Sequence, residues 1–441
     1  MLLRFTLENI DSFKHATEFN MFPSSKSHNH ETHKVICDYA TVLRLSAIYG
    51  ANGAGKSNLL RGIRLLKALV STGTLTNVKF PDDLSFKFDR KCLEQPSEMA
   101  IEFFQNGKIF YYHIVFDKTR IYQEELYLSK KNKDIALFSR NGKLTINGEF
   151  LEKGVNEQFN DALDRLVRHD MLFLSFIGKY YPDEIPSVTD AYKWFIDRLE
   201  VVLPIYSAQA IPFLIDSDHE FANMVNSIMP EFNTGILRLK AKKEIINEDN
   251  IQSDSQLSSI VSKARQHPGE PQAMLFEKFG IPRNIVFVNG QVYSVTLVSI
   301  HSGNDGNEVE MPMEQESDGT RRIIEYMLLL YDIIYKAKVY VVDEIERSVH
   351  PILIKAIVRK LSHGNNMSGQ LIFTTHESAL LDQRIFRPDE IWFAQKDSEQ
   401  ATQLYTLSDF NIHKTANIEN GYLGGRYGGI PFLSNLEDLN W

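Results

Sequence analysis

Residues 50–57 read Gly50-Ala51-Asn52-Gly53-Ala54-Gly55-Lys56-Ser57. An apolar run at 43–49 precedes them and predicts a buried strand, and residues 58–70 carry apolar side chains at helical spacing. A glycine-rich turn between a strand and a helix is where a phosphate-binding loop lies. Such glycines let backbone N–H groups point at phosphate oxygens, and the helix N-terminus adds partial positive charge. We therefore expect a P-loop; an ordinary glycine turn is the alternative.

The end of this segment carries side chains suited to a nucleotide triphosphate. Lys56 is expected to reach the β- and γ-phosphates and to act in catalysis, and the Ser57 hydroxyl is expected to complete a Mg²⁺ shell. ATP and Mg²⁺ are thus the expected cofactors. The other loop positions that we expect to contact ATP are Gly50, Asn52, Gly53, Ala54, Gly55 and Asn58.

A second apolar run, residues 338–342, ends in Asp343-Glu344. A carboxylate at the end of a strand beside a P-loop can hold the Mg²⁺ shell, which is the role that we assign to Asp343. Glu344 can orient and polarise the attacking water, and we expect it to be catalytic. The alternative is a solvated acidic turn.

Two further motifs follow. Ser348-Val349-His350-Pro351 occupies a turn, where Pro351 suits the start of a helix at 352–361. His376 ends an apolar strand at 370–375 and is expected to hydrogen-bond the γ-phosphate. A lone histidine at a strand end is usually structural, but its place in the ordered series favours a catalytic role.

The ordered series resembles the ABC-type ATPase heads of the structural-maintenance-of-chromosomes, Rad-fifty-like and RecF-like group. Glu316-Ser317-Asp318-Gly319-Thr320 is similar to the signature motif of these heads, with Glu316 in place of the usual leucine. The resemblance implies that Ser317, Gly319 and Thr320 cap the γ-phosphate of ATP held by another subunit. Gly319 permits close backbone approach, and a helix expected at 321–335 would point its N-terminus at the anion. A plain helix N-cap is the alternative.

Within that group the chain resembles stand-alone ATPases of bacterial anti-phage and abortive-infection systems, among them the ATPase subunit of the PARIS defence system. The segments that carry this likeness are Leu137-Phe138-Ser139-Arg140, Leu172-Phe173-Leu174-Ser175, Arg387-Pro388-Asp389-Glu390-Ile391-Trp392-Phe393 and the tail from Gly421 to Pro431. The position of the glutamine loop of such heads does not follow from this sequence, and Gln123 is one candidate for it. The tail glycines permit either assembly contacts or an intramolecular turn.

Composition favours a globular cytoplasmic protein without a membrane segment. The chain has 441 residues, 43% of them apolar and 24% charged. No apolar run approaches the roughly 20 residues that span a bilayer, and no cleavable signal begins the chain. Cys37 and Cys92 are too few for a disulfide framework. The net charge of -9 argues against strong nonspecific nucleic-acid binding, although DNA binding at a local basic patch stays open.

The expected fold class is α/β: an ABC-type P-loop ATPase head with an inserted, mostly helical domain. Residues 1–130 would form the first half of the head, 131–285 the helical insertion and 286–441 the second half. Asn106-Gly107 is a strong hairpin signal inside the first half. The loop at 23–34 holds His28, His30 and His33. Histidines at this spacing can bind a metal ion, but a solvent-exposed loop is the preferred interpretation.

Three functions compete. The first is a cytosolic ATPase that acts as a sensor or scaffold in phage defence. It would assemble as a homo-oligomer with ATP sandwiched between subunits, respond to a phage protein and control a separately encoded toxic effector, expected to be a nuclease. The second is a RecF-like or SMC-like DNA-repair ATPase that clamps DNA. The third, an ATPase that energises a transporter, is least favoured. A fused nuclease is not expected, because residues 377–441 are fewer than the roughly 100 residues of a typical domain.

Overall fold

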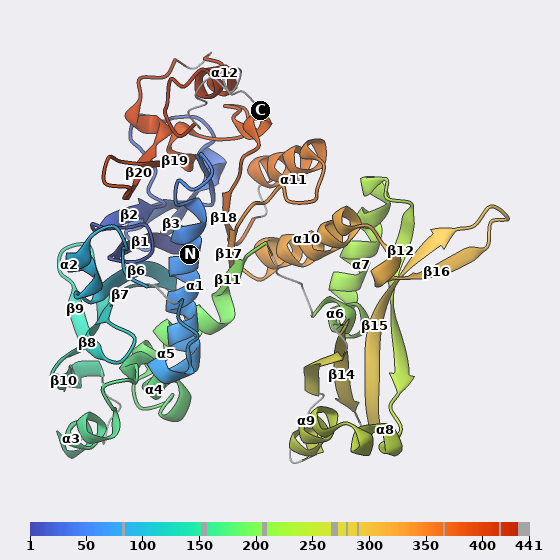
Figure 1. The fold of residues 1–441 in the computed structure, drawn as a ribbon, viewed down its shortest axis with the longest axis horizontal. Coiled ribbons are helices and arrows are strands. Elements are labelled where there is room, and N and C mark those ends of the chain that lie inside the picture. The colour runs from blue at the N-terminus through green and yellow to red at the C-terminus, as the bar shows by residue number, and fades with distance from the viewer. Residues whose placement is uncertain are drawn as a thin grey trace, which may run out of the picture. The chain divides into compact units, whose positions relative to one another are not determined.

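The computed structural model describes the chain in nine stretches: residues 1–81, 84–150, 157–204, 210–265, 272–278, 281–288, 291–364, 367–413 and 416–430 (Figure 1). Contacts divide the chain into two compact units. The first unit comprises Met1–Pro204, Ile333–Glu346 and Ile354–Trp441, and the second comprises Ile205–Asp332 and Arg347–Leu353. Among the described residues, none of the helices combines the length and apolar character needed to cross a bilayer.

The first unit contains a seven-stranded antiparallel sheet. In sheet order its strands are β10 (Lys143–Ile146), β9 (Ile135–Asn141), β8 (Ile121–Ser129), β7 (Lys108–Phe116), β6 (Ser97–Gln105), β1 (Leu2–Glu8) and β2 (Thr17–Asn20). The predicted hairpin is confirmed: Gln105 pairs with Lys108 across Asn106 and Gly107, whose φ angles are 49° and 77°. Positive φ at both turn positions suits the twist of the flanking strands, which is why Asn-Gly is favoured there.

A six-stranded sheet in the same unit carries the P-loop. Its order is β11 (Leu199–Val202), β17 (Val339–Val342), β18 (Gln370–Thr374), β5 (Leu45–Gly50), β19 (Ile391–Lys396) and β20 (Thr402–Thr406). All pairs are parallel except β19 with β20. Because parallel strands end at the same edge, the residues that follow β5, β17 and β18 come together there. The expected mixed α/β architecture is confirmed.

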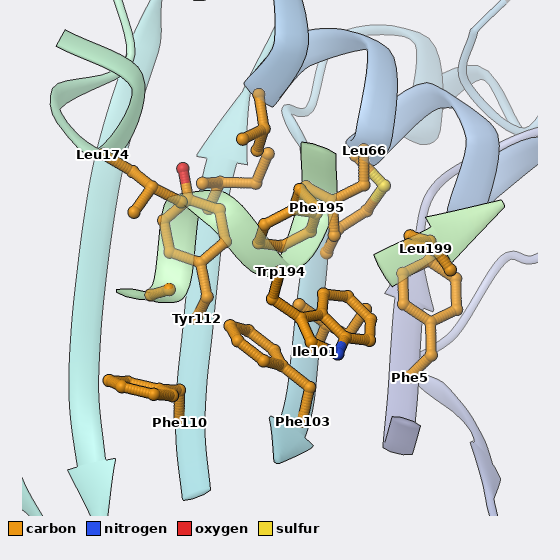
Figure 2. Packing of buried hydrophobic residues seen from close by; sticks show 14 of the residues in the cluster. Phe5, Leu66, Ile101, Phe103, Phe110, Tyr112, Leu174, Trp194, Phe195 and Leu199 are labelled. Atoms are coloured by element: carbon orange, nitrogen blue, oxygen red, sulfur yellow. The ribbon is translucent and has the colours of Figure 1, made fainter. Parts of the chain in front are cut away.

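Helix α1 (Lys56–Thr72) packs against the seven-stranded sheet and the six-stranded sheet of the first unit. Its buried residues include Leu59, Leu60, Ile63, Leu66, Leu69 and Val70, which lie at helical spacing. Figure 2 shows Leu66 in this core near Phe195, with Trp194 over the β6 side chain Phe103. The Trp194 and Phe103 rings stack with centroids 4.3 Å apart. The helix ends at Gly73, whose φ of 81° suits a C-terminal glycine.

Smaller elements complete the first unit. They are β3 (Lys34–Cys37), β4 (Ala40–Leu43), α2 (Arg90–Leu93), α3 (Glu157–Leu166), α4 (Phe173–Tyr180), α5 (Pro186–Lys193) and α12 (Ile418–Leu423), with α11 (Pro351–His363) from Ile354 onward.

The Leu172-Phe173-Leu174-Ser175 segment forms the N-terminus of α4. There the buried Glu124 carboxylate accepts the Phe173 and Leu174 N–H groups at 2.7 and 2.9 Å. A carboxylate from β8 thus satisfies amides that the helix itself leaves free.

The expected mostly helical insertion over 131–285 is not confirmed. Residues 131–204 belong to the first unit, because β9 and β10 extend its antiparallel sheet. The second unit is built around strands β12 (Ile236–Ile245), β13 (Gln272–Lys278), β14 (Ile281–Val288), β15 (Gln291–Ser302) and β16 (Glu308–Pro312). Its helices are α6 (Ile211–Ser217), α7 (His219–Ile228), α8 (Glu248–Ser253), α9 (Ser255–Arg265) and α10 (Asp318–Tyr335), the last of which reaches Asp332 within the unit.

The loop at 23–34 is not the solvent-exposed segment that was expected. His28 is exposed, but His33 is buried, with Nδ1 2.8 Å from the Glu390 carboxylate and Nε2 2.8 Å from the Ser362 carbonyl oxygen. Buried Arg387 donates to the Ser27 carbonyl oxygen at 2.9 Å. The Arg387-Pro388-Asp389-Glu390 motif therefore anchors this loop. The described part of the chain holds no group of three or more His, Cys, Asp or Glu side chains suited to a metal ion.

Candidate functional site

The P-loop leaves β5 at Gly50 and enters α1 at Lys56, which confirms the predicted strand–loop–helix order. Gly53 and Gly55 have φ of 76° and 105°, values that side chains other than glycine rarely adopt. Space is also limiting, since a Cβ on Gly55 would lie 2.1 Å from Thr402 Oγ1 and one on Gly50 2.5 Å from the Ala394 carbonyl oxygen. Gly55 is therefore required by packing as well as by conformation, Gly53 by conformation and Gly50 by packing.

Two hydroxyl groups outside the motif hold the loop. The Thr402 Oγ1 atom lies 2.9 Å from the Ala54 carbonyl oxygen and 2.7 Å from Ser12 Oγ. Asn58, expected to contact ATP, donates its side-chain amide to Ser12 Oγ at 2.8 Å. Ser12 lies in the turn after β1 and Thr402 begins β20. Sequence reasoning missed this support, because no local pattern marks a threonine nearly 400 positions from the serine that it contacts.

Lys56 is turned into its own loop. Its ammonium donates to the Gly50 and Ala51 carbonyl oxygens at 2.7 and 3.1 Å, and the residue is 5% exposed. Burial lowers the pKa of Lys56 to about 8, against the opposing influence of Asp343, Glu346 and Glu344. Phosphate oxygens offer this ammonium stronger, charged acceptors than two neutral carbonyl groups.

Ser57 and Asp343 meet at the edge of the sheet. Ser57 Oγ donates to Asp343 Oδ1 at 3.1 Å, and Thr374 Oγ1, at the end of β18, donates to the same oxygen at 2.5 Å. A hydroxyl and a carboxylate at this separation are the oxygen ligands that Mg²⁺ accepts beside a triphosphate. The two residues predicted as metal ligands are therefore adjacent and fit that ion. Sequence reasoning missed Thr374, which fixes the carboxylate.

The loops after β17 and β18 carry the other expected catalytic residues. Glu344 has φ of 50°, and its backbone N–H donates to Thr374 Oγ1 at 2.8 Å. His376 is exposed, yet desolvation by its surroundings lowers its pKa, and Lys56 lowers it further against the opposing carboxylates. The His376 backbone N–H donates to Glu346 Oε1 at 2.6 Å. Sequence reasoning missed Glu346, although Asp343-Glu344-Ile345-Glu346 places a third carboxylate beside the predicted pair.

The residues of the expected signature lie in the second unit. Ser317 Oγ accepts the Thr320 N–H at 3.0 Å, so Ser317 does cap α10, which begins at Asp318 rather than at 321. A Cβ on Gly319 would lie 2.6 Å from the Ser348 carbonyl oxygen, which shows why glycine stands there.

Glu316, which replaces the usual leucine, has partners of its own. Its Oε1 accepts from Ser299 Oγ at 2.5 Å and lies 2.7 Å from His301 Nε2. The signature segment is thereby tied to β15.

Two expectations concerned residues away from this edge. Gln123 lies in β8, paired with Val115 and Asn141 in the seven-stranded sheet. The tail forms an intramolecular turn, in which Tyr422 donates to the Gly429 carbonyl oxygen at 3.1 Å. A Cβ on Gly429 would lie 3.6 Å from the Gly50 Cα, so the tail packs against the start of the P-loop. Pro431 lies outside the described residues.

Comparisons with known proteins agree with a nucleotide-binding fold. A family model described as "AAA domain, putative AbiEii toxin, Type IV TA system" matches residues 45–382. No curated protein matches the sequence.

Two solved structures show a distant likeness. One is an SMC head bound to the C-terminal winged-helix domain of ScpA, with 11% identity, a TM-score of 0.43 and coverage of 92% of this chain and 97% of that chain. The other is the SMC head domain from Thermotoga maritima, with 11% identity, a TM-score of 0.35 and coverage of 93% of this chain and 99% of that chain.

The family match spans most of the chain, from the P-loop strand to the segment after His376, and this chain therefore belongs to the AbiEii-type AAA domain family.

Proposed function

We propose that this protein is an ABC-type ATPase that binds Mg²⁺-ATP at the P-loop and hydrolyses it. The observation that carries the proposal is the cluster of Ser57, Asp343 and Thr374, which lies at the sheet edge directly beside the P-loop lysine. Phosphoryl transfer needs positioning and charge neutralisation more than covalent chemistry, and this cluster supplies ligands for the metal that neutralises the triphosphate.

Each residue has a defined task in this proposal. Lys56 leaves the loop carbonyls and binds the β- and γ-phosphates, while backbone N–H groups of the loop cradle them. Ser57 and Asp343 would hold Mg²⁺, which would supply positive charge at the phosphates. Glu344 accepts a hydrogen bond from the attacking water and orients it in line with the γ-phosphate. His376 donates a hydrogen bond to the γ-phosphate.

The signature residues require a second copy of the chain in this scheme. Ser317, Gly319 and Thr320 begin a helix of 18 residues, and a helix N-terminus favours an anion. We infer that they close over ATP bound by the P-loop of another subunit. The expected minimal assembly is a homodimer with two shared sites.

Phage defence is the biological role that we favour. The matching family carries the words AbiEii toxin and Type IV TA system in its description, which names a toxin–antitoxin context. In this role a phage protein triggers the ATPase, which holds or releases a separately encoded effector, expected to be a nuclease, as the resemblance to the PARIS ATPase subunit implies. ATP state can bias such a partner only if the partner binds the two states with different affinity.

Three variants test the enzymatic proposal. Lys56→Ala should abolish ATP binding, whereas Glu344→Gln should keep binding and lose turnover, since the metal ligands remain while the water loses its base. Arg64→Ala, at an exposed position of the same helix, is the matched control and should behave as wild type. Fluorescent-ATP binding and phosphate release measure the two properties separately. Normal turnover in Glu344→Gln would contradict the assignment.

A second experiment addresses the role. Expression of the protein with its neighbouring gene should protect cells from phage and expression alone should not, and the two products should co-purify. If the protein instead binds DNA in an ATP-dependent manner with a steep salt dependence, the DNA-clamping function takes precedence.

A further inference from the structure

Besides the bond from Thr374 Oγ1 to Asp343 Oδ1, three hydrogen bonds between described residues join the segment after β17 to the end of β18 and the loop that follows it. Glu344 N donates to Thr374 Oγ1 at 2.8 Å, and Ile345 N donates to the Thr374 carbonyl oxygen at 3.1 Å. The third bond, from His376 N to Glu346 Oε1 at 2.6 Å, is the one that reaches the histidine expected at the γ-phosphate. It is also the only one of the three that depends on the carboxyl group of a side chain.

The second carboxylate oxygen of Glu346 is in a different situation. Glu346 Oε2 is buried, and it has no hydrogen-bond donor among the residues that the structure describes. Lys56 and His376 lie near enough to interact electrostatically with this carboxylate. A buried carboxylate oxygen without a donor is costly. A residue that served only to hold a backbone N–H would not need this second charged oxygen.

We propose that Glu346 is a positioning residue of the nucleotide site, with one oxygen fixing the backbone of His376 and the other accepting a hydrogen bond from a water molecule when ATP is bound. This inference rests on the proposed ATPase function. Phosphate oxygens and the neighbouring carboxylates are acceptors and cannot supply the donor. Lys56, the His376 ring, the loop N–H groups and the signature residues are engaged by phosphates in that function, and a water molecule is the donor that we propose for Glu346.

Two substitutions separate the tasks of the two oxygens. Glu346→Gln keeps a carbonyl acceptor for His376 N but places an N–H₂ donor where the second oxygen accepts. Glu346→Ala removes both acceptors. Glu419→Gln is the matched control, because Glu419 accepts one hydrogen bond from Ser378 just downstream of the same loop.

Steady-state ATP hydrolysis reports on the second oxygen. We expect kcat to fall about tenfold in Glu346→Gln and about a hundredfold in Glu346→Ala, with KM within about threefold of wild type, because the lost interactions act after ATP is bound. The control should retain wild-type kcat. Wild-type kcat in Glu346→Gln would overturn the water-binding role, and a raised KM with unchanged kcat would show that Glu346 only assists binding.

Hydrogen exchange at the His376 amide reports on the first oxygen and needs no turnover. Exchange should be slow in wild type and in Glu346→Gln and about tenfold faster in Glu346→Ala. Equal exchange in all three proteins would overturn the positioning role. If the wild-type protein binds ATP without hydrolysing it, the enzymatic proposal and the water-binding role both fail, whereas the exchange result still decides whether Glu346 holds His376. Thermal denaturation of each variant identifies a change caused by misfolding.

Discussion

Thr402→Val tests whether the P-loop is held in shape from outside its own motif. The substitution is nearly isosteric, and Thr402 is 1% exposed, so the main loss is the hydroxyl that lies 2.9 Å from the Ala54 carbonyl oxygen and 2.7 Å from Ser12 Oγ. Ser12 keeps the hydrogen bond from Asn58. The Ala54 carbonyl oxygen loses this partner in a buried place, and an unsatisfied buried acceptor costs about 1–3 kcal/mol.

The expected result is a free energy of unfolding lower by about 1–3 kcal/mol for the nucleotide-free protein. If half of this loss, about 0.5–1.5 kcal/mol, falls on the loop conformation that binds phosphate, ATP affinity falls by about 2- to 12-fold, since about 1.4 kcal/mol corresponds to a factor of ten. Urea denaturation and fluorescent-ATP titration measure the two quantities. Thr402→Ser keeps the hydroxyl and should bind ATP as wild type does, and Thr76→Val, at an exposed site, should change neither property. Unchanged stability and affinity in Thr402→Val would refute the idea that this contact supports the loop.

Three further predictions concern the remaining residues of the site. Glu316→Leu introduces the residue that is usual in the ATPase heads that this chain resembles. It should lower ATP turnover about tenfold, because Ser299 and His301 lose their acceptor. Glu316→Gln should retain more activity, and higher activity in the leucine variant would contradict the reasoning. The pKa of His376 is lower in the folded protein than in the unfolded chain, so the unfolded chain binds the proton of this ring more readily. The protein therefore loses stability as the pH falls from the ordinary pKa of histidine towards the lower pKa of the folded state. His376→Gln should flatten that part of the stability–pH curve, and an unchanged curve counts against it. Finally, when Ser317→Ala and Lys56→Ala proteins are mixed and exchange subunits, each mixed dimer has one intact shared site and one site with both substitutions. The mixture should therefore show more ATPase activity than the sum of the two variants measured separately.

The parts of the site that sequence patterns predicted are those with strong local chemistry. The loop from Gly50 to Ser57 has the conformation that its glycines demand, and Asp343 follows a buried strand as its apolar run indicated. The Asn106-Gly107 turn is equally local. In each case a few neighbouring residues determine the backbone, so a single sequence suffices.

The contacts that sequence patterns could not predict join distant positions. Thr402 and Glu346 act through partners that only the folded chain brings near, and neither lies in a motif with a recognised spacing. The expected helical insertion was not confirmed, and the reason lies in the second unit. Its strand β12 contains Lys240, Lys242 and Lys243, and lysine is depleted in strands, so its pairing with β15 leaves only a weak local signal.

The tail has a consequence for how substitutions at its glycines will be tolerated. Residues 424–430, which follow α12, form a turn rich in glycine, and in a saturation mutagenesis experiment such a segment would ordinarily accept most replacements. Here Gly428 and Gly429 have φ of 70° and 67°, and Gly429 lies against the first glycine of the P-loop. The number of tolerated amino acids per position should therefore be lowest in two separate segments, the P-loop and the Gly428-Gly429 turn almost 380 positions later. We expect the turn to be as intolerant of side chains as the P-loop.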